Sequence, residues 1–138
     1  MAVATAAVFV WLGMVLAISF LEAPLKFRAP GVTPAIGLAV GRLVFRALNL
    51  AEVLLALVVV VAVLVGGAPS GVLTAVVVLL VLLAVQLVGV RPPLNRRSER
   101  VLAGEAPPRS RLHLAYIGLE VAKVVLLVVT GVLVLAAG

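Results

Sequence analysis

Residues 48–65 read LNLAEVLLALVVVVAVLV, an apolar run in which Glu52 is the only charged side chain. A stretch of this length and character is typical of a membrane-spanning helix, because about 20 helical residues cross the hydrocarbon core. Its many valines do not indicate strands, since apolar and polar residues do not alternate and lipid admits only helices or closed barrels as spanning structures. The sequence therefore predicts a membrane helix that carries a carboxylate.

Further apolar stretches occur on both sides of this run. Including it, we expect four transmembrane helices, near residues 3–23, 35–65, 72–90 and 112–136. Proline and glycine mark the intervals, and Pro92-Pro93 is expected to end the third helix. The predicted fold class is all-α: a polytopic membrane protein in which residues 1–138 form one four-helix bundle with loops at 24–34 and 91–111.

Helix capping supports these boundaries. Thr33 followed by Pro34 is typical of a helix start, and Ser70 and Ser110 stand where they could cap the third and fourth helices. The second stretch is longer than a bilayer needs. We therefore expect its first turns, with Arg42 and Arg46, to project into the headgroups or the cytoplasm.

The composition points to lipid as the main solvent. The chain has 138 residues, of which 65% are hydrophobic, against about 45–50% in a typical soluble domain. The mean hydropathy is +1.39. Cysteine is absent, which excludes disulfides and thiolate chemistry. The net charge of +6 comes from basic residues that flank apolar segments, so we expect the lipid bilayer and its anionic headgroups as partners, and no nucleic acid.

The distribution of Lys and Arg predicts the orientation. Both long loops are basic, whereas the 66–71 turn and the two chain ends carry no Lys or Arg. The positive-inside rule then places the long loops in the cytoplasm and both termini outside. The first segment has no basic region before it, so we expect a spanning helix and not a cleaved signal peptide. The expected location is a bacterial inner (plasma) membrane.

Two parts of the chain resemble each other. Residues 48–53 (LNLAEV) are similar to residues 117–121 (IGLEV), and Pro24-Leu25-Lys26 is similar to residues 93–96 (PLNR). Such similarity is compatible with a tandem repeat of a helical hairpin, an arrangement found in transporters. Chance similarity is the alternative in so apolar a composition.

Polar residues in the predicted helices gather on stripes. In the fourth helix His113, Tyr116, Glu120 and Lys123 fall within about 80° at 100° per residue. In the second helix Arg42, Arg46, Asn49 and Glu52 cover about 120° by the same count. Glu22 and Gln86 lie near the cytoplasmic ends of the other two helices. We therefore predict that polar groups meet in the cytoplasmic half of the bundle.

A charge in hydrocarbon costs about 2.5 kcal/mol or more, so it needs a partner or a function. Two interpretations stay open. The groups either pair as a structural clasp or line a cavity that binds an ion, a proton or a small solute. The candidate binding residues are Glu22, Arg46, Asn49, Glu52, His113, Tyr116, Glu120 and Lys123. The predicted function is transport or ion handling; the alternative is an accessory or scaffold subunit of a larger membrane complex.

Four helices enclose little volume, so we expect a homo-oligomer or a partner membrane subunit. No phosphate loop, dinucleotide fingerprint or nucleophile elbow is present, and we predict no catalytic residue and no cofactor. Metal binding by His113 with Glu22, Glu52 and Glu120 is a weaker alternative, because the Glu-x-x-His pairs of di-iron bundles are missing; we predict no metal. The arginine-rich segment 91–111 is either a solvated loop or a short interfacial helix.

The first hairpin resembles a known family. Trp11-Leu12-Gly13-Met14, Phe20, Leu25, Phe27-Arg28, Gly37 and Leu43-Val44-Phe45 are similar to the opening of a small four-helix membrane family. That family includes a eukaryotic transmembrane protein linked to cisplatin resistance and bacterial relatives of unassigned function. The resemblance covers the first third of the chain, and the later half departs from it with a shorter, proline-broken loop. It implies the same four-helix plan and no catalytic residues.

Overall fold

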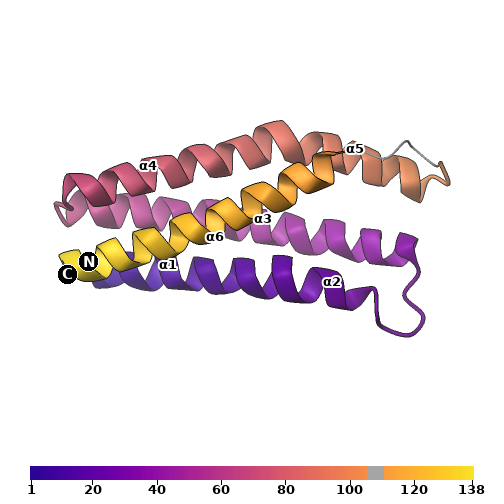
Figure 1. Ribbon diagram of the computed structural model, residues 1–138, viewed down its shortest axis with the longest axis horizontal. Helices are drawn as coiled ribbons and strands as arrows, with labels where there is room; N and C mark the ends of the chain where they lie inside the picture. Colours follow the sequence, from indigo (N-terminus) through magenta and orange to yellow (C-terminus); the bar gives the residue numbers. More distant parts are fainter. Residues whose placement is uncertain (106–110) are drawn as a thin grey trace.

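The computed structural model describes residues 1–105 and 111–138, and these residues form long helical rods that run antiparallel (Figure 1). The first and third rods each consist of three successive helical segments without a break between them. The segments are α1 (Ala2–Val15), η1 (Leu16–Glu22), α2 (Ala23–Lys26), α3 (Pro34–Val65), α4 (Ser70–Ala84), η2 (Val85–Val90), α5 (Arg91–Leu102) and α6 (Leu112–Ala137). Within the described residues, four rods are long and apolar enough to cross a membrane.

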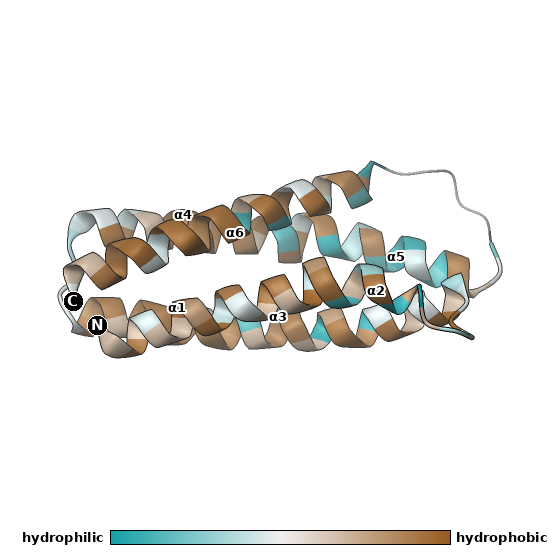
Figure 2. Cartoon of the chain, turned by 60° about the horizontal axis from the view of Figure 1, so that its bottom comes forward, coloured by the Kyte–Doolittle hydropathy of each residue, from teal (hydrophilic) through white to brown (hydrophobic). Residues whose placement is uncertain are grey.

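The rods form a bundle in which α1 packs against α3 and α6, and α4 packs against α6 and α3. Helices α3 and α6 therefore lie on opposite corners. The two chain termini lie side by side at the end of the bundle that also holds the α3–α4 turn (Figure 1). Segments α2 and α5 lie at the other end, where hydrophilic residues gather (Figure 2). The fold thus separates an apolar end from a polar end.

The predicted helix starts have mixed outcomes. Thr33 caps α3 as expected, because its side-chain oxygen accepts a hydrogen bond of 3.2 Å from the backbone N–H of Ile36. The prediction for Ser70 was wrong: Pro69 is the N-cap of α4, and Ser70 is already inside the helix. Its carbonyl accepts a hydrogen bond from the hydroxyl of Thr74. Ser110 lies outside the described residues.

The predicted end of the third helix at Val90 was also wrong. The rod continues through Pro92-Pro93 to Leu102, so residues 91–102 are helical and not a loop. The prolines are the second and third residues of α5, inside a rod that is helical on both sides of them. The π-helical segment η2 leads directly into α5. Pro24 is accommodated in the same way after the π-helical segment η1.

Hydrocarbon side chains fill the bundle on the side of the termini. Val8 and Val15 of α1 meet Leu79 of α4 and Leu127 of α6 in one buried cluster. Gly131 of α6 permits a close approach there, since a Cβ at this position would lie 2.8 Å from the Phe9 ring. Many large apolar side chains face outward, which is expected of helices that are solvated by lipid.

Candidate functional site

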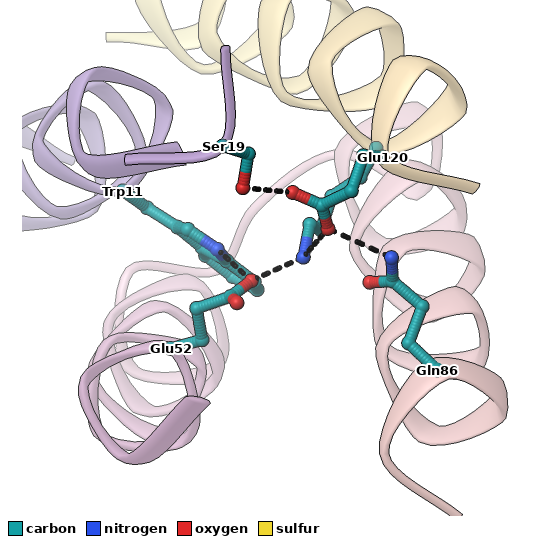
Figure 3. A network of polar contacts seen from close by, with 6 residues as sticks. Trp11, Ser19, Glu52, Gln86 and Glu120 are labelled. Carbon is teal, nitrogen blue, oxygen red and sulfur yellow. Dashed lines mark hydrogen bonds and ion pairs between the residues drawn. The ribbon is translucent and has the colours of Figure 1, made fainter. Parts of the chain in front are cut away.

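Six polar side chains meet inside the bundle at the boundary between its apolar and polar ends (Figure 3). We refer to them as the buried network. Its members are Trp11 of α1, Ser19 of η1, Glu52 of α3, Gln86 of η2, and Glu120 and Lys123 of α6. Each of the four rods contributes at least one member, so the network requires the whole bundle.

Lys123 is the centre of this network. Its Nζ lies 2.6 Å from Oε2 of Glu52 and 2.7 Å from Oε1 of Glu120. The three side chains are 1%, 0% and 2% exposed, respectively. Because α3 and α6 occupy opposite corners of the bundle, the Lys123–Glu52 ion pair crosses its interior. The spacing of Glu120 and Lys123 on α6 lets both reach the same place, since residues three apart share a helix face.

Neutral donors also form hydrogen bonds with both carboxylates. The indole Nε1 of Trp11 donates a 2.8 Å hydrogen bond to Oε2 of Glu52. The hydroxyl of Ser19 donates to Oε2 of Glu120 at 2.6 Å, and Nε2 of Gln86 donates to Oε1 of Glu120 at 2.7 Å. Glu120 thereby accepts from three side chains, whereas Glu52 accepts from two.

The network has an excess of negative charge and of acceptors. Two carboxylates face one ammonium group, so the three groups sum to −1 when all are ionised. Oε1 of Glu52 and Oε1 of Gln86 are buried and have no hydrogen-bond partner among the described residues. Buried acceptors are normally paired, because burying one without a partner is costly. A proton or a small cation would satisfy both the charge and a free oxygen.

A pocket of about 490 Å³ lies next to the network, toward the polar end; we refer to it as the main pocket. Ser19 and Glu120 belong both to its lining and to the buried network. Its walls come from η1, α2, α3, α5 and α6, and include the rings of Phe45 and Tyr116. A side pocket of about 440 Å³ shares Phe45 and Arg91 with it.

Close packing of α2 onto α3 shapes the main pocket. Gly37 has the ring of Phe27 directly above it, so a Cβ there would collide with that ring. A Cβ on Gly41 would lie 2.8 Å from Nζ of Lys26. The two glycines therefore allow Phe27 and Lys26 to lie against α3, where all four residues line the pocket.

The structure brings three of the predicted site residues together, Glu52, Glu120 and Lys123. Tyr116 is buried, and it lines the main pocket with the exposed His113. Arg46 and Asn49 line the side pocket instead.

Glu22 also lies outside the network. Its carboxylate is 3.9 Å from Nζ of Lys26, one helical turn away. Among the described residues, Arg46 forms no ion pair with Glu22 or Glu52. Within the same residues, no group of three His, Cys, Asp or Glu side chains lies close enough to hold a metal ion.

Sequence reasoning missed four residues of this region as site members: Trp11, Ser19, Gln86 and Arg91. One signal was available for Gln86, which is the only polar side chain between Thr74 and Arg91 in the third rod. Trp11 shares a face with Ala4, Val8 and Val15 at helical spacing, and that face is the buried one.

Comparisons of the chain with protein-family models, curated proteins and solved structures found no match.

Proposed function

We propose that this chain is a small integral membrane protein that binds an ion or small solute in the main pocket and handles a proton or cation at the buried network. One observation carries the proposal: Glu120 forms an ion pair with Lys123 and also lines the pocket. A ligand that enters the pocket thus meets a carboxylate that shares one ammonium group with Glu52. Carboxylates inside membrane segments are common in proton and ion pathways.

The proposed position in a bilayer supports this role. Glu52 lies about 20 Å along α3 from Val65 at 1.5 Å per residue. If the hydrocarbon core of about 30 Å begins at the apolar end, the network lies in its inner half, and α5 with the polar ends of α2 and α3 lies beyond it. The basic residues of the polar end would then face the cytoplasm, so the main pocket would open to the cytoplasm.

The proton-handling role can be tested by measuring proton movement. The protein is reconstituted into liposomes that contain a pH-sensitive dye, and a membrane potential is imposed with potassium and valinomycin. We expect the wild-type chain to move protons and Glu120→Gln to lose this flux. Thr130→Val is the matched control, because the Thr130 hydroxyl is buried in α6 but bonds only its own helix, at the Leu126 carbonyl.

A hydrophobic carbodiimide provides a second measurement on the same preparation. This reagent modifies protonated carboxyl groups in apolar surroundings, and mass spectrometry locates the modified residue. We expect modification at Glu120, which borders the pocket, and little at Glu52, which does not line it. Absence of flux in the wild-type protein together with unmodified Glu120 would contradict proton handling.

The second candidate is a structural clasp in an accessory subunit, and it rests on the participation of all four rods in the network. In that case Glu120→Gln would lower thermal stability, because the ion pair is lost, and wild-type liposomes would show no flux. Persistent co-purification of other membrane chains would support the accessory role. A stable homo-oligomer with flux would support transport.

A further inference from the structure

We propose that the ligand of the main pocket is an organic anion with an apolar body, and that Arg91 binds its carboxylate or phosphate group. The inference rests on the proposed function, because it specifies the ligand of the same pocket. It starts from Arg91, the first residue of α5, which lines both the main pocket and the side pocket.

Arg91 is held between two aromatic rings. Its Cζ lies 4.5 Å from the ring centroid of Tyr116 and 4.7 Å from that of Phe45. The two rings stand almost perpendicular, with centroids 5.9 Å apart. An arginine packed against aromatic faces keeps its charge and loses conformational freedom, so its guanidinium is positioned before any ligand arrives.

The guanidinium lacks the partner that such a group normally has. The Tyr116 hydroxyl interacts electrostatically with the guanidinium, but Nε and Nη2 of Arg91 are shielded from solvent and have no hydrogen-bond partner among the described residues. No carboxylate of those residues forms an ion pair with Arg91; Glu99 pairs with Arg42 and Glu105 with Arg100. Two free N–H donors on one planar fork match the two oxygens of a carboxylate or phosphate.

The rest of the pocket suits an apolar body and a negative charge. Phe20, Phe27 and Ile117 contribute hydrocarbon walls, and Lys26 adds a second positive charge. Glu120 is coordinated by Lys123, Gln86 and Ser19, which offset part of its negative charge. The volume of about 490 Å³ is sufficient for a molecule of aromatic-acid size or for part of a lipid.

The test uses the full chain in nanodiscs of zwitterionic phosphatidylcholine. Isothermal titration calorimetry measures binding of 2-naphthoate, with the neutral 2-naphthylmethanol and inorganic phosphate as comparison probes. We expect naphthoate to bind and Arg91→Ala to weaken it about tenfold or more, which is the scale of a lost charged hydrogen bond. Arg96→Ala is the matched control, since Arg96 lies on the same helix and lines neither pocket.

A lipid headgroup offers the same chemistry, and a second arm separates the two sources. Wild type and variants are placed in mixed phosphatidylglycerol and phosphatidylcholine nanodiscs, and native mass spectrometry counts the retained lipids. Arg91-dependent retention of phosphatidylglycerol without naphthoate binding would support the proposal with a lipid as the ligand. Equal binding of naphthoate and its neutral analogue, or anion binding that Arg91→Ala leaves unchanged, would overturn it.

If Arg91→Ala does not fold, Arg91→Lys carries the test. Lysine keeps the positive charge but lacks the planar fork, so we expect naphthoate or phosphatidylglycerol to bind at least about fivefold more weakly. Unchanged affinity would overturn the proposal. The Glu120→Gln flux experiment is independent. Flux with no Arg91-dependent anion binding refutes this inference alone, and anion binding without flux and with unmodified Glu120 refutes proton handling alone.

Discussion

The two ends of the bundle satisfy their polar groups in different ways. Toward the termini, the hydroxyls of Thr5, Thr74 and Thr130 each bond a carbonyl four residues earlier on the same helix. In the buried network and beyond it, side chains bond across helices, as Lys123 does with Glu52 and Arg42 with Glu99. The apolar end therefore depends on packing, whereas the polar end depends on specific partners. The following variants test this difference.

The largest effect is expected from Lys123→Met. The change removes the only ammonium group from the network and leaves Glu52 and Glu120 buried together without a counter-charge. Breaking a buried ion pair on one side costs about 3–5 kcal/mol. Unfolding in mixed micelles, titrated with SDS and followed by circular dichroism, measures the loss.

A compensated variant sharpens this prediction. Glu52→Gln with Glu120→Gln and Lys123→Met removes all three charges, and we expect it to recover most of the stability, because neutral polar side chains are cheaper to bury than an unpaired charge. If the triple variant is as unstable as Lys123→Met alone, electrostatics do not explain the loss.

Leu79→Ala tests the apolar end. Leu79 is fully buried in α4 and belongs to the core cluster. We expect a loss of about 2 kcal/mol, the lower end of the range for such deletions, because lipid contributes little hydrophobic driving force between helices. The same unfolding assay applies, with the exposed Val81→Ala as control. A loss as large as that of Lys123→Met would remove the distinction between the two ends.

A smaller effect is expected from Trp11→Phe. The phenyl ring keeps most of the packing volume of Trp11 and loses the 2.8 Å hydrogen bond to Glu52. Polar contacts between membrane helices are worth about 0.6 kcal/mol on average and up to about 1.7 kcal/mol. We expect about 1 kcal/mol in the unfolding assay, because Glu52 keeps Lys123. No change would show that the indole N–H is dispensable.

The smallest effect is expected from Glu99→Gln. Glu99 pairs with Arg42 at 3.0 Å, but both side chains are substantially exposed. Exposed pairs contribute about 0.2–1 kcal/mol and weaken with salt. We expect a shift of a few tenths of a kcal/mol at low ionic strength that vanishes at high salt. A loss of stability that does not depend on salt would show that this pair behaves like the buried contacts.

Hydropathy predicted the four rods because each apolar run is long enough to leave no other structure in lipid. It also singled out Glu52, Glu120 and Lys123, since charges are conspicuous against leucine and valine. That Lys123 pairs with both carboxylates at once depends on how α3 and α6 rotate toward each other, since Glu52 and Lys123 are 71 positions apart in sequence.

Arg91 shows why the lining of the pocket was predicted only in part. Pro92-Pro93 is an ordinary helix terminator by sequence, and a terminated helix would have left Arg91 at the start of a loop. The rod continues instead, and it places Arg91 against Phe45 and Tyr116 of other helices. Sequence rules judge such prolines from the residues beside them, whereas the helix here tolerates them after a π-helical segment.

The π-helical segments η1 and η2 have a consequence for the direction in which later side chains point. A wide turn of this kind accommodates one residue more than an α-helical turn, so it resets the angular phase of everything downstream. Lys26 and Arg91 both follow such a turn. If the same residues wound as a regular α-helix without the wide turn, the side chains that follow would point about 100° further around the helix axis. The positive charge of the pocket thus depends on the directions in which helical side chains point as much as on which residues are present.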